Sequence, residues 1–137
     1  MEITVSTSQG PNTPVTVIQP HGDVDASNYA QLIEKVQSLL QDGARDFILD
    51  LSDVPFMSSA GLVALHSIAN MLRGEKATDT QSGWQALKSI DRSKESGLQK
   101  HVKLLSPQQY VADTFDKAGF TQFFEIFSSL DQAVASF

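Results

Sequence analysis

Short segments with the two-residue period of β-strands alternate along this chain with segments of helical period, and this alternation restricts the fold more than any other feature. Ile3–Ser6 and Val15–Ile18 alternate apolar and polar side chains, and the turn formers of residues 9–12 lie between them, which predicts a β-hairpin that ends at Pro20 and Gly22. Further short apolar runs predict three more strands, at residues 47–51, 102–105 and 123–127.

The first helical segment begins at Tyr29, because apolar residues recur there on one face of a helix. That face consists of Tyr29, Leu32, Ile33, Val36, Leu39 and Leu40. Asp25 or Ser27 is suited to cap its start, and Gly43 follows its end.

Three further helices are expected along the chain. The second begins at Ser58 or Ser59, turns Leu62, Leu65, Ala69 and Leu72 inward, and stops near Gly74. The third begins at Ser106–Pro107, turns Val111, Phe115 and Ala118 inward, and ends at Gly119. In the fourth, Ser128 and Asp131 are suited to cap a terminal helix that runs through Val134 and Phe137.

The order of elements predicts an α/β fold, with a mixed central sheet of four to five strands flanked by about four helices. We expect one domain over residues 1–137, with an insert at about 74–100 between the second helix and the following strand. The insert is polar and far longer than an ordinary connection. It is either a loop with one short helix around Trp84, Leu87 and Ile90, or a flap that binds a partner.

Composition and charge exclude several classes of function. The net charge is −6 with no cluster of Lys and Arg, which disfavours nucleic acid and anionic membrane surfaces as partners. There is no cysteine for a disulfide or a thiolate metal site. No apolar stretch approaches about 20 residues and Met1–Val5 does not begin a signal peptide, so we expect a cytoplasmic protein without membrane insertion. The expected partner is a protein, and the expected state is a monomer or weak dimer.

Residues 50–62 hold the most informative pattern, a buried strand that leads through a turn into a helix with hydroxyl side chains at its start. Free N–H groups and the positive end of the dipole make a helix start favourable for an anion. A serine at that point can accept a phosphate group of about −2 charge with little cost to the fold. Serine at a helix start is also a common structural feature, so this pattern alone does not establish a switch.

Catalytic patterns are missing from the sequence. His21, His66 and His101 match no metal-ligand spacing. Residues 57–61 lack the first glycine of a nucleophile elbow, and no phosphate-binding loop of the nucleotide hydrolases is present. We therefore expect no enzymatic activity and no cofactor.

Three segments, in the same order along the chain, resemble STAS domains, which are typified by bacterial anti-sigma-factor antagonists. Asp50–Leu62 resembles the family signature, and Gly22–Ala26 is similar to its Gly-Glu/Asp-Leu/Ile-Asp segment. Downstream, Leu104–Pro107 and Phe115–Phe120 are similar to the family's third helix and its ending. The resemblance covers nearly the whole chain except the insert.

The resemblance implies a phospho-switch, because the family's phosphorylated serine falls on Ser59, with Ser58 as the alternative acceptor. The partner would be an anti-sigma factor that is itself a serine protein kinase; the domain binds it when unphosphorylated and is released by phosphorylation, which regulates transcription. The residues implied to lie near the phosphate or the partner are Asp23, Asp25, Ser52, Asp53, Ser58 and Gly61.

Two positions differ from the family pattern and keep other functions open. Ser58 stands where the family usually has Asp, and Ala60 where it usually has Ser or Thr. One alternative is a STAS scaffold or transporter-associated subunit that is not phosphorylated. Another is a sensor of a small ligand or nucleotide.

Overall fold

A five-stranded mixed sheet forms the centre of the fold. The computed structural model describes residues 1–72 and 99–137. The strands, in spatial order, are β1 (Glu2–Gln9), β2 (Pro14–His21), β3 (Asp46–Asp50), β4 (Val102–Leu105) and β5 (Ile126–Phe127). The helices are α1 (Tyr29–Gln41), α2 (Ser59–Leu72), α4 (Gln109–Ala118) and α5 (Leu130–Ala135), with a 3-10 turn, η1 (Phe120–Gln122). The described residues thus confirm the predicted α/β class and the predicted order of elements.

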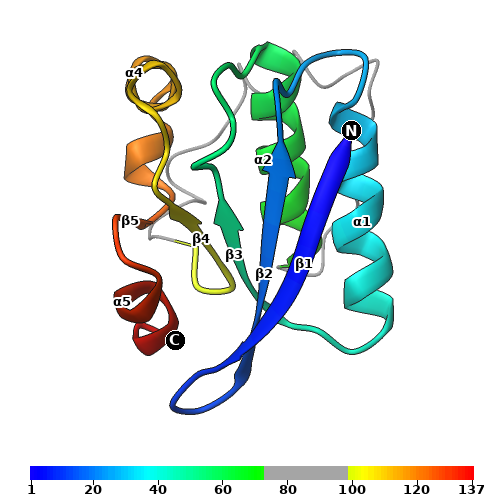
Figure 1. Cartoon of the computed structure of the whole chain (residues 1–137), viewed down its shortest axis with the longest axis vertical. Coiled ribbons are helices and arrows are strands. Elements are labelled where there is room, and N and C mark those ends of the chain that lie inside the picture. Colours follow the sequence, from blue (N-terminus) through cyan, green and yellow to red (C-terminus); the bar gives the residue numbers. More distant parts are fainter. Residues whose placement is uncertain (73–98) are drawn as a thin grey trace.

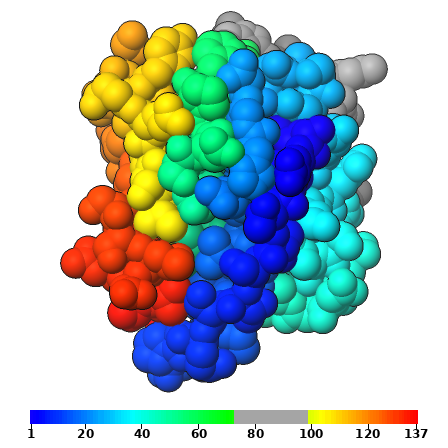
Figure 2. Space-filling model, viewed as in Figure 1, coloured from blue at the N-terminus to red at the C-terminus, as the bar shows by residue number. Residues whose placement is uncertain are grey.

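The connections decide which face each helix covers. β1 and β2 form the predicted antiparallel hairpin, and β2, β3, β4 and β5 are parallel neighbours. Each pair of parallel neighbours needs a crossover connection. Because the three crossovers have the same handedness and proceed in the same direction across the sheet, their helices lie on the same face of it. In Figure 1, α1 and α2 accordingly lie behind the sheet, whereas α5 lies in front of it at the lower left. Figure 2 shows this front side, with α5 in red and β1 in dark blue at the surface.

The apolar core is divided by the sheet into a large part and a small part. The large part packs α1, α2 and α4 against the face of the sheet that carries Ile18, Leu49 and Leu104. The small part packs α5, through Ala133, against the opposite face at Val15 and Ile48. Most of the buried apolar side chains lie between the sheet and these three helices. Their packing therefore holds the helices, and the loops that lead into them, in place against the sheet.

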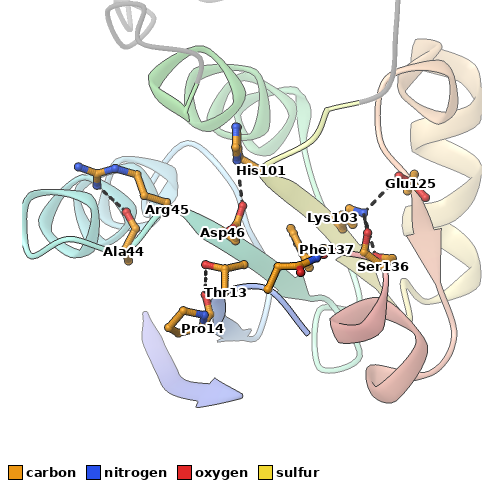
Figure 3. A network of polar contacts seen from close by, with 11 residues as sticks. Thr13, Pro14, Ala44, Arg45, Asp46, His101, Lys103, Glu125, Ser136 and Phe137 are labelled. Atoms are coloured by element: carbon orange, nitrogen blue, oxygen red, sulfur yellow. Dashed lines mark hydrogen bonds and ion pairs between the residues drawn. The ribbon is translucent and has the colours of Figure 1, made fainter. Parts of the chain in front are cut away.

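A buried lysine connects α5 to the sheet at the amino ends of the parallel strands (Figure 3). Lys103 is only 4% exposed, and its Nζ donates to the carbonyl and the hydroxyl of Ser136 and lies 3.3 Å from Glu125. The same ammonium lies 4.5 Å from the centre of the Phe137 ring. Its charge is therefore compensated on several sides, as burial of a lysine requires. The neighbouring His101 pairs with Asp46 at 2.8 Å.

Several predicted boundaries were wrong around α4. The helix begins at Gln109, two residues after Pro107, because the Ser106 amide still donates to the Phe127 carbonyl at 2.7 Å with a φ of 50°. At the other end, Gly119 stops the helix as predicted, with a φ of 77°, but Ala118 is exposed rather than buried. The left-handed turn at Gly119 instead sends Phe120 into the core.

The last strand and the two predicted caps also differ. Of the predicted strand 123–127 only Ile126–Phe127 pairs, since the aromatic residues before it are buried in the turn after η1. The terminal helix is capped by Ser129, not Ser128, and stops at Ala135. Neither Asp25 nor Ser27 caps α1; Asn28 occupies that position without a side-chain cap.

Two other expectations concern the hairpin end and the insert. Pro20 does not end β2, which continues to His21; the proline pairs with Ile3 of β1, where β3 no longer accompanies the strand. The predicted insert at about 74–100 lies outside the described residues except for Gln99 and Lys100, and so does its predicted helix at Trp84, Leu87 and Ile90.

None of the described helices combines the length and apolar character needed to span a bilayer.

Candidate functional site

Two loops lie side by side where the parallel strands end, and they bring the predicted site residues together. One follows β2 (residues 22–28) and the other follows β3 (residues 51–58). Their backbones pair: Gly22 N–H donates to the Asp53 carbonyl at 2.9 Å, and Val24 N–H donates to the Phe56 carbonyl at 3.0 Å. In the opposite direction, the Ser58 amide donates to the Val24 carbonyl at 2.9 Å. This short parallel bridge sets the position from which α2 starts.

The two candidate serines differ in what their side chains do. Ser58 is half-buried and caps α2, because its Oγ accepts the Ala60 N–H at 3.2 Å and its carbonyl accepts the Leu62 N–H. Ser59 is the first residue of α2 and is exposed, and its hydroxyl bonds to no residue that the structure describes. The cap of α2 is thus Ser58 and not Ser59.

The start of α2 retains donors for an anion. Within the part of the chain that the structure describes, the N–H groups of Ser59 and Gly61 have no hydrogen-bond partner, while that of Ala60 is taken by Ser58. Unpaired N–H groups in a first helical turn carry the partial positive charge of the helix dipole. A dianion on Ser59 would therefore lie beside this positive end.

Gly61 is required by packing. A Cβ at this position would overlap Met57 Cγ and would lie 3.2 Å from Val24 Cγ1. Both neighbours belong to the bridge between the two loops and are fully buried. The absence of a side chain at Gly61 therefore lets the first turn of α2 press against the bridge, which places Ser59 at the surface beside it.

Asp23 and Asp25 flank Val24, so the bridge carries both of them next to the start of α2. Asp23 is exposed, and its carbonyl accepts a bond from the Asn28 side chain at 2.8 Å. Asp25 organises its own loop: its Oδ1 accepts the Ser27 hydroxyl at 2.5 Å and the Ser27 N–H at 2.9 Å. These bonds, with the hydroxyl first, stabilise the carboxylate and lower the pKa of Asp25.

Ser52 and Asp53 join the loop of residues 51–58 to its surroundings. Ser52 Oγ accepts a bond from the Gln19 side chain at 3.1 Å, and the Ser52 carbonyl accepts one from Gln108 Nε2 at 2.9 Å. The Asp53 carboxylate contacts His21. Their role in the structure is therefore to hold the loop, and three of the side chains that do this, Gln19, His21 and Gln108, were not predicted as site residues. No short-range signal in the sequence marks them, because each contact joins residues far apart in the chain.

The two loops at this end of the described structure carry charges of one sign. Residues 22–28 and 51–58 contain Asp23, Asp25 and Asp53 and no lysine or arginine. The described cations instead include Arg45, Lys100 and Lys103 near the amino ends of the parallel strands, which Figure 3 shows in part. No group of three His, Asp or Glu side chains in the described ranges could hold a metal ion.

Comparison with known proteins decides the family. The sequence profile of the STAS domain matches residues 4–78, which is more than half of the chain. The chain belongs to the STAS domain family. This confirms the resemblance seen in residues 22–26 and 50–62. No curated protein sequence matches this STAS domain significantly.

Solved structures agree with this fold. A candidate anti-sigma factor antagonist from Thermotoga maritima is 17% identical with a TM-score of 0.65, and the match covers 94% of this chain and 90% of that one. An anti-sigma factor antagonist from Mycobacterium paratuberculosis is also 17% identical, with a TM-score of 0.62 and coverage of 96% and 91%. The phosphorylated form of the Bacillus cell fate determinant SpoIIAA is 14% identical, with a TM-score of 0.53 and coverage of 96% of both chains. At these identities the likeness shows the fold alone.

Proposed function

We propose that this STAS domain is an anti-sigma-factor antagonist whose binding is switched by phosphorylation of Ser59. The observation that carries the proposal is the exposed Ser59 hydroxyl at the first position of α2, which, like the N–H groups of Ser59 and Gly61 beside it, has no hydrogen-bond partner among the described residues. The partner would be a cytoplasmic anti-sigma factor with serine kinase activity. The STAS family match is consistent with this class of function, and the shared fold includes SpoIIAA, an anti-sigma factor antagonist that has been solved in a phosphorylated form.

The switch follows from where the charge is added. In the unphosphorylated state the exposed hydroxyl can enter the active site of the kinase and face the γ-phosphate of ATP. After transfer, the serine carries a charge of about −2, and this group repels the phosphates of the nucleotide that the kinase holds. Within the domain, the same charge is stabilised by the start of α2, so the fold persists. Phosphorylation thus weakens the complex without unfolding the antagonist.

Ser59 is preferred to Ser58 because the two hydroxyls differ in availability. Phosphorylation of Ser58 would place a bulky dianion on the half-buried oxygen that caps α2, and would remove the bond to the Ala60 N–H. Phosphorylation of Ser59 breaks no bond that the structure describes.

The test is phosphorylation by purified kinases. Each anti-sigma-factor serine kinase encoded in the source genome is incubated with ATP and the wild-type domain, Ser58→Ala or Ser59→Ala, and the sites are mapped by mass spectrometry. We expect one kinase to label the wild type and Ser58→Ala at Ser59 and to leave Ser59→Ala unlabelled. Ser58→Ala is the matched control, since it removes a neighbouring hydroxyl of the same helix start.

The contradicting results are equally specific. Label on Ser58 with Ser59 untouched would overturn the site, and no label from kinases that are active on their own antagonists would overturn the switch. Binding gives a second readout: Ser59→Asp should weaken the complex, whereas Ser59→Ala should keep it in the presence of ATP. Equal affinity of both variants, with no label, is the behaviour of a scaffold that is not phosphorylated.

A further inference from the structure

Two exposed aromatic side chains meet on the same end of the molecule as Ser59. Phe56, in the loop before α2, is 36% exposed, and Tyr110, in the first turn of α4, is 57% exposed. Their ring centres are 5.6 Å apart with an angle of 36° between the planes. The other large apolar side chains exposed in the described ranges, Ile126 and Leu130, lie around β5 and α5, outside this pair.

The aromatic pair is fixed to the loop of residues 51–58, which leads to Ser59. Phe56 is three residues before Ser59, and its carbonyl takes part in the bridge by accepting the Val24 N–H. Tyr110 follows Gln108, whose side chain donates to the Ser52 carbonyl of the same loop at 2.9 Å. The Gln108 bond and the contact between the rings therefore hold the start of α4 against this loop, and the bond to Val24 fixes Phe56 beside the start of α2.

Such a pair has the properties of an interface anchor. Aromatic rings exposed to water gain free energy when a partner covers them, and Tyr and Phe are enriched at the centres of protein interfaces. The rings are already in contact and mounted on bonded elements, so ordering them on binding costs little. The loops beside them carry Asp23, Asp25 and Asp53 and no lysine or arginine, which favours a partner with cations around the contact.

We propose that Phe56 and Tyr110 form the apolar centre of the docking surface for the anti-sigma-factor kinase, and that α4 is part of this surface. This inference rests on the proposed function. The partner surface has an apolar pocket for the two rings and Lys or Arg side chains that face the three aspartates. Tyr110 lies outside residues 4–78, where the chain matches the family profile, so this contact is a property of this chain that the match does not supply.

The aromatic centre and the acceptor have different tasks in this arrangement. The rings and the surrounding aspartates contribute affinity in both phosphorylation states, because neither changes when Ser59 reacts. Release comes from repulsion between the phosphoserine and the nucleotide phosphates in the kinase active site. Loss of a ring should therefore weaken binding of the substrate and leave the rate of phosphate transfer in the bound complex unchanged.

The experiment uses the kinase that labels Ser59 and four alanine variants of the full chain. Phe56→Ala and Tyr110→Ala remove the proposed anchors, and Ile126→Ala and Leu130→Ala remove apolar side chains elsewhere that are about as exposed as Phe56. By calorimetry we expect each anchor variant to bind at least about tenfold more weakly and both controls to stay within about twofold, as truncation of an interface anchor commonly does. KM for phosphorylation should rise in the anchor variants while kcat stays unchanged.

Two further variants guard against indirect effects. Tyr110→Phe keeps the ring and should bind like the wild type, whereas Tyr110→Arg places a cation opposite the cations of the partner and should bind more weakly than Tyr110→Ala. Circular dichroism of every variant verifies the fold. Added salt should weaken wild-type binding, since charge attraction between exposed groups is screened.

The outcomes separate this inference from the proposed function. If the kinase labels Ser59 but the anchor variants bind like Ile126→Ala and Leu130→Ala, the docking surface is wrong and the switch stands. A drop in kcat at unchanged KM would likewise overturn the anchor role. If no kinase labels Ser59, the proposed function and this docking surface both fall.

Discussion

His21 Nδ1 lies 2.5 Å from Asp53 Oδ2, and this contact joins the end of β2 to the loop that carries the candidate acceptor. The other ring nitrogen, Nε2, lies 2.7 Å from the Thr4 hydroxyl of β1. The imidazole at the end of β2 therefore contacts β1 through one nitrogen and the loop of residues 51–58 through the other. Directly beside it, the Gly22 amide donates to the Asp53 carbonyl. A side-chain contact and a backbone hydrogen bond therefore both join the end of β2 to Asp53.

A double-mutant cycle measures this connection. His21→Ala and Asp53→Ala should each lower the free energy of unfolding, and the coupling between them should be about 0.5–1 kcal/mol, because both side chains are partly exposed to water. Urea unfolding of the four proteins gives the coupling. Strictly additive effects would show that the contact contributes nothing to the position of the loop.

The two serines at the start of α2 should respond differently to alanine. Ser58→Ala removes the oxygen that accepts the Ala60 N–H, so we expect a loss of about 1 kcal/mol in the free energy of unfolding. Ser59→Ala should change it little or raise it slightly, because alanine is the better helix former at an exposed position. Thermal or urea unfolding tests the pair, and an equal loss in both variants would contradict the assignment of the cap.

Gly61→Ala should disturb the acceptor site from within. The added methyl group would overlap Met57 and force the first turn of α2 away from the bridge, at a cost of about 1–3 kcal/mol. Met57→Ala frees the space, so the double variant should be more stable than the sum of the single effects predicts. Unfolding measurements that give simple additivity would show that the helix start avoids the clash in another way.

The stability contributed by Asp25 should depend on pH in a defined direction. Bonds from Ser27 lower the pKa of this carboxyl in the folded protein. The stability that the carboxylate contributes is therefore fully present at pH values above the pKa of the unfolded state, about 3.9. As the pH falls through the lower folded pKa, the folded protein takes up the proton too and the contribution is lost. Asp25→Asn should therefore be less stable than the wild type near neutral pH, and the difference should shrink in acid. A constant difference across this range would argue against the bonded carboxylate.

Much of the fold is predictable because the side chains repeat with clear periods. The alternation in residues 3–6 and 15–18 gives the hairpin, and the single apolar face from Tyr29 to Leu40 gives α1. Gly43 and Gly119 end their helices with positive φ, as their places in the sequence indicate. The helix start at Ser58 and Ser59 was also predictable, because a buried strand, a turn and two hydroxyl residues follow one another directly.

Contacts between distant segments set the parts that the sequence does not predict. Ser106–Pro107 has the local signature of a helix start, yet the bond from Ser106 to Phe127 keeps it in the sheet. The aromatic run after η1 is apolar enough for a strand, but burial of Phe123 and Phe124 in the core, where Phe124 packs against Phe120, competes with pairing. In the site, the meeting of Phe56 with Tyr110 depends on how α4 packs beside the loop, and nothing local in either segment indicates it.

The direction of α2 has a consequence for how this domain can be altered or extended. The helix runs from Ser59 to Leu72, and fourteen residues at 1.5 Å each carry the chain about 20 Å from the acceptor. The chain re-enters the described fold at Gln99, just before β4 starts, and so again at the end of the sheet remote from Ser59. Both junctions of residues 73–98 are thus remote from Ser59. Lengthening, trimming or labelling the chain at these junctions offers a route to report on the proposed docking without altering the proposed acceptor or the start of α2.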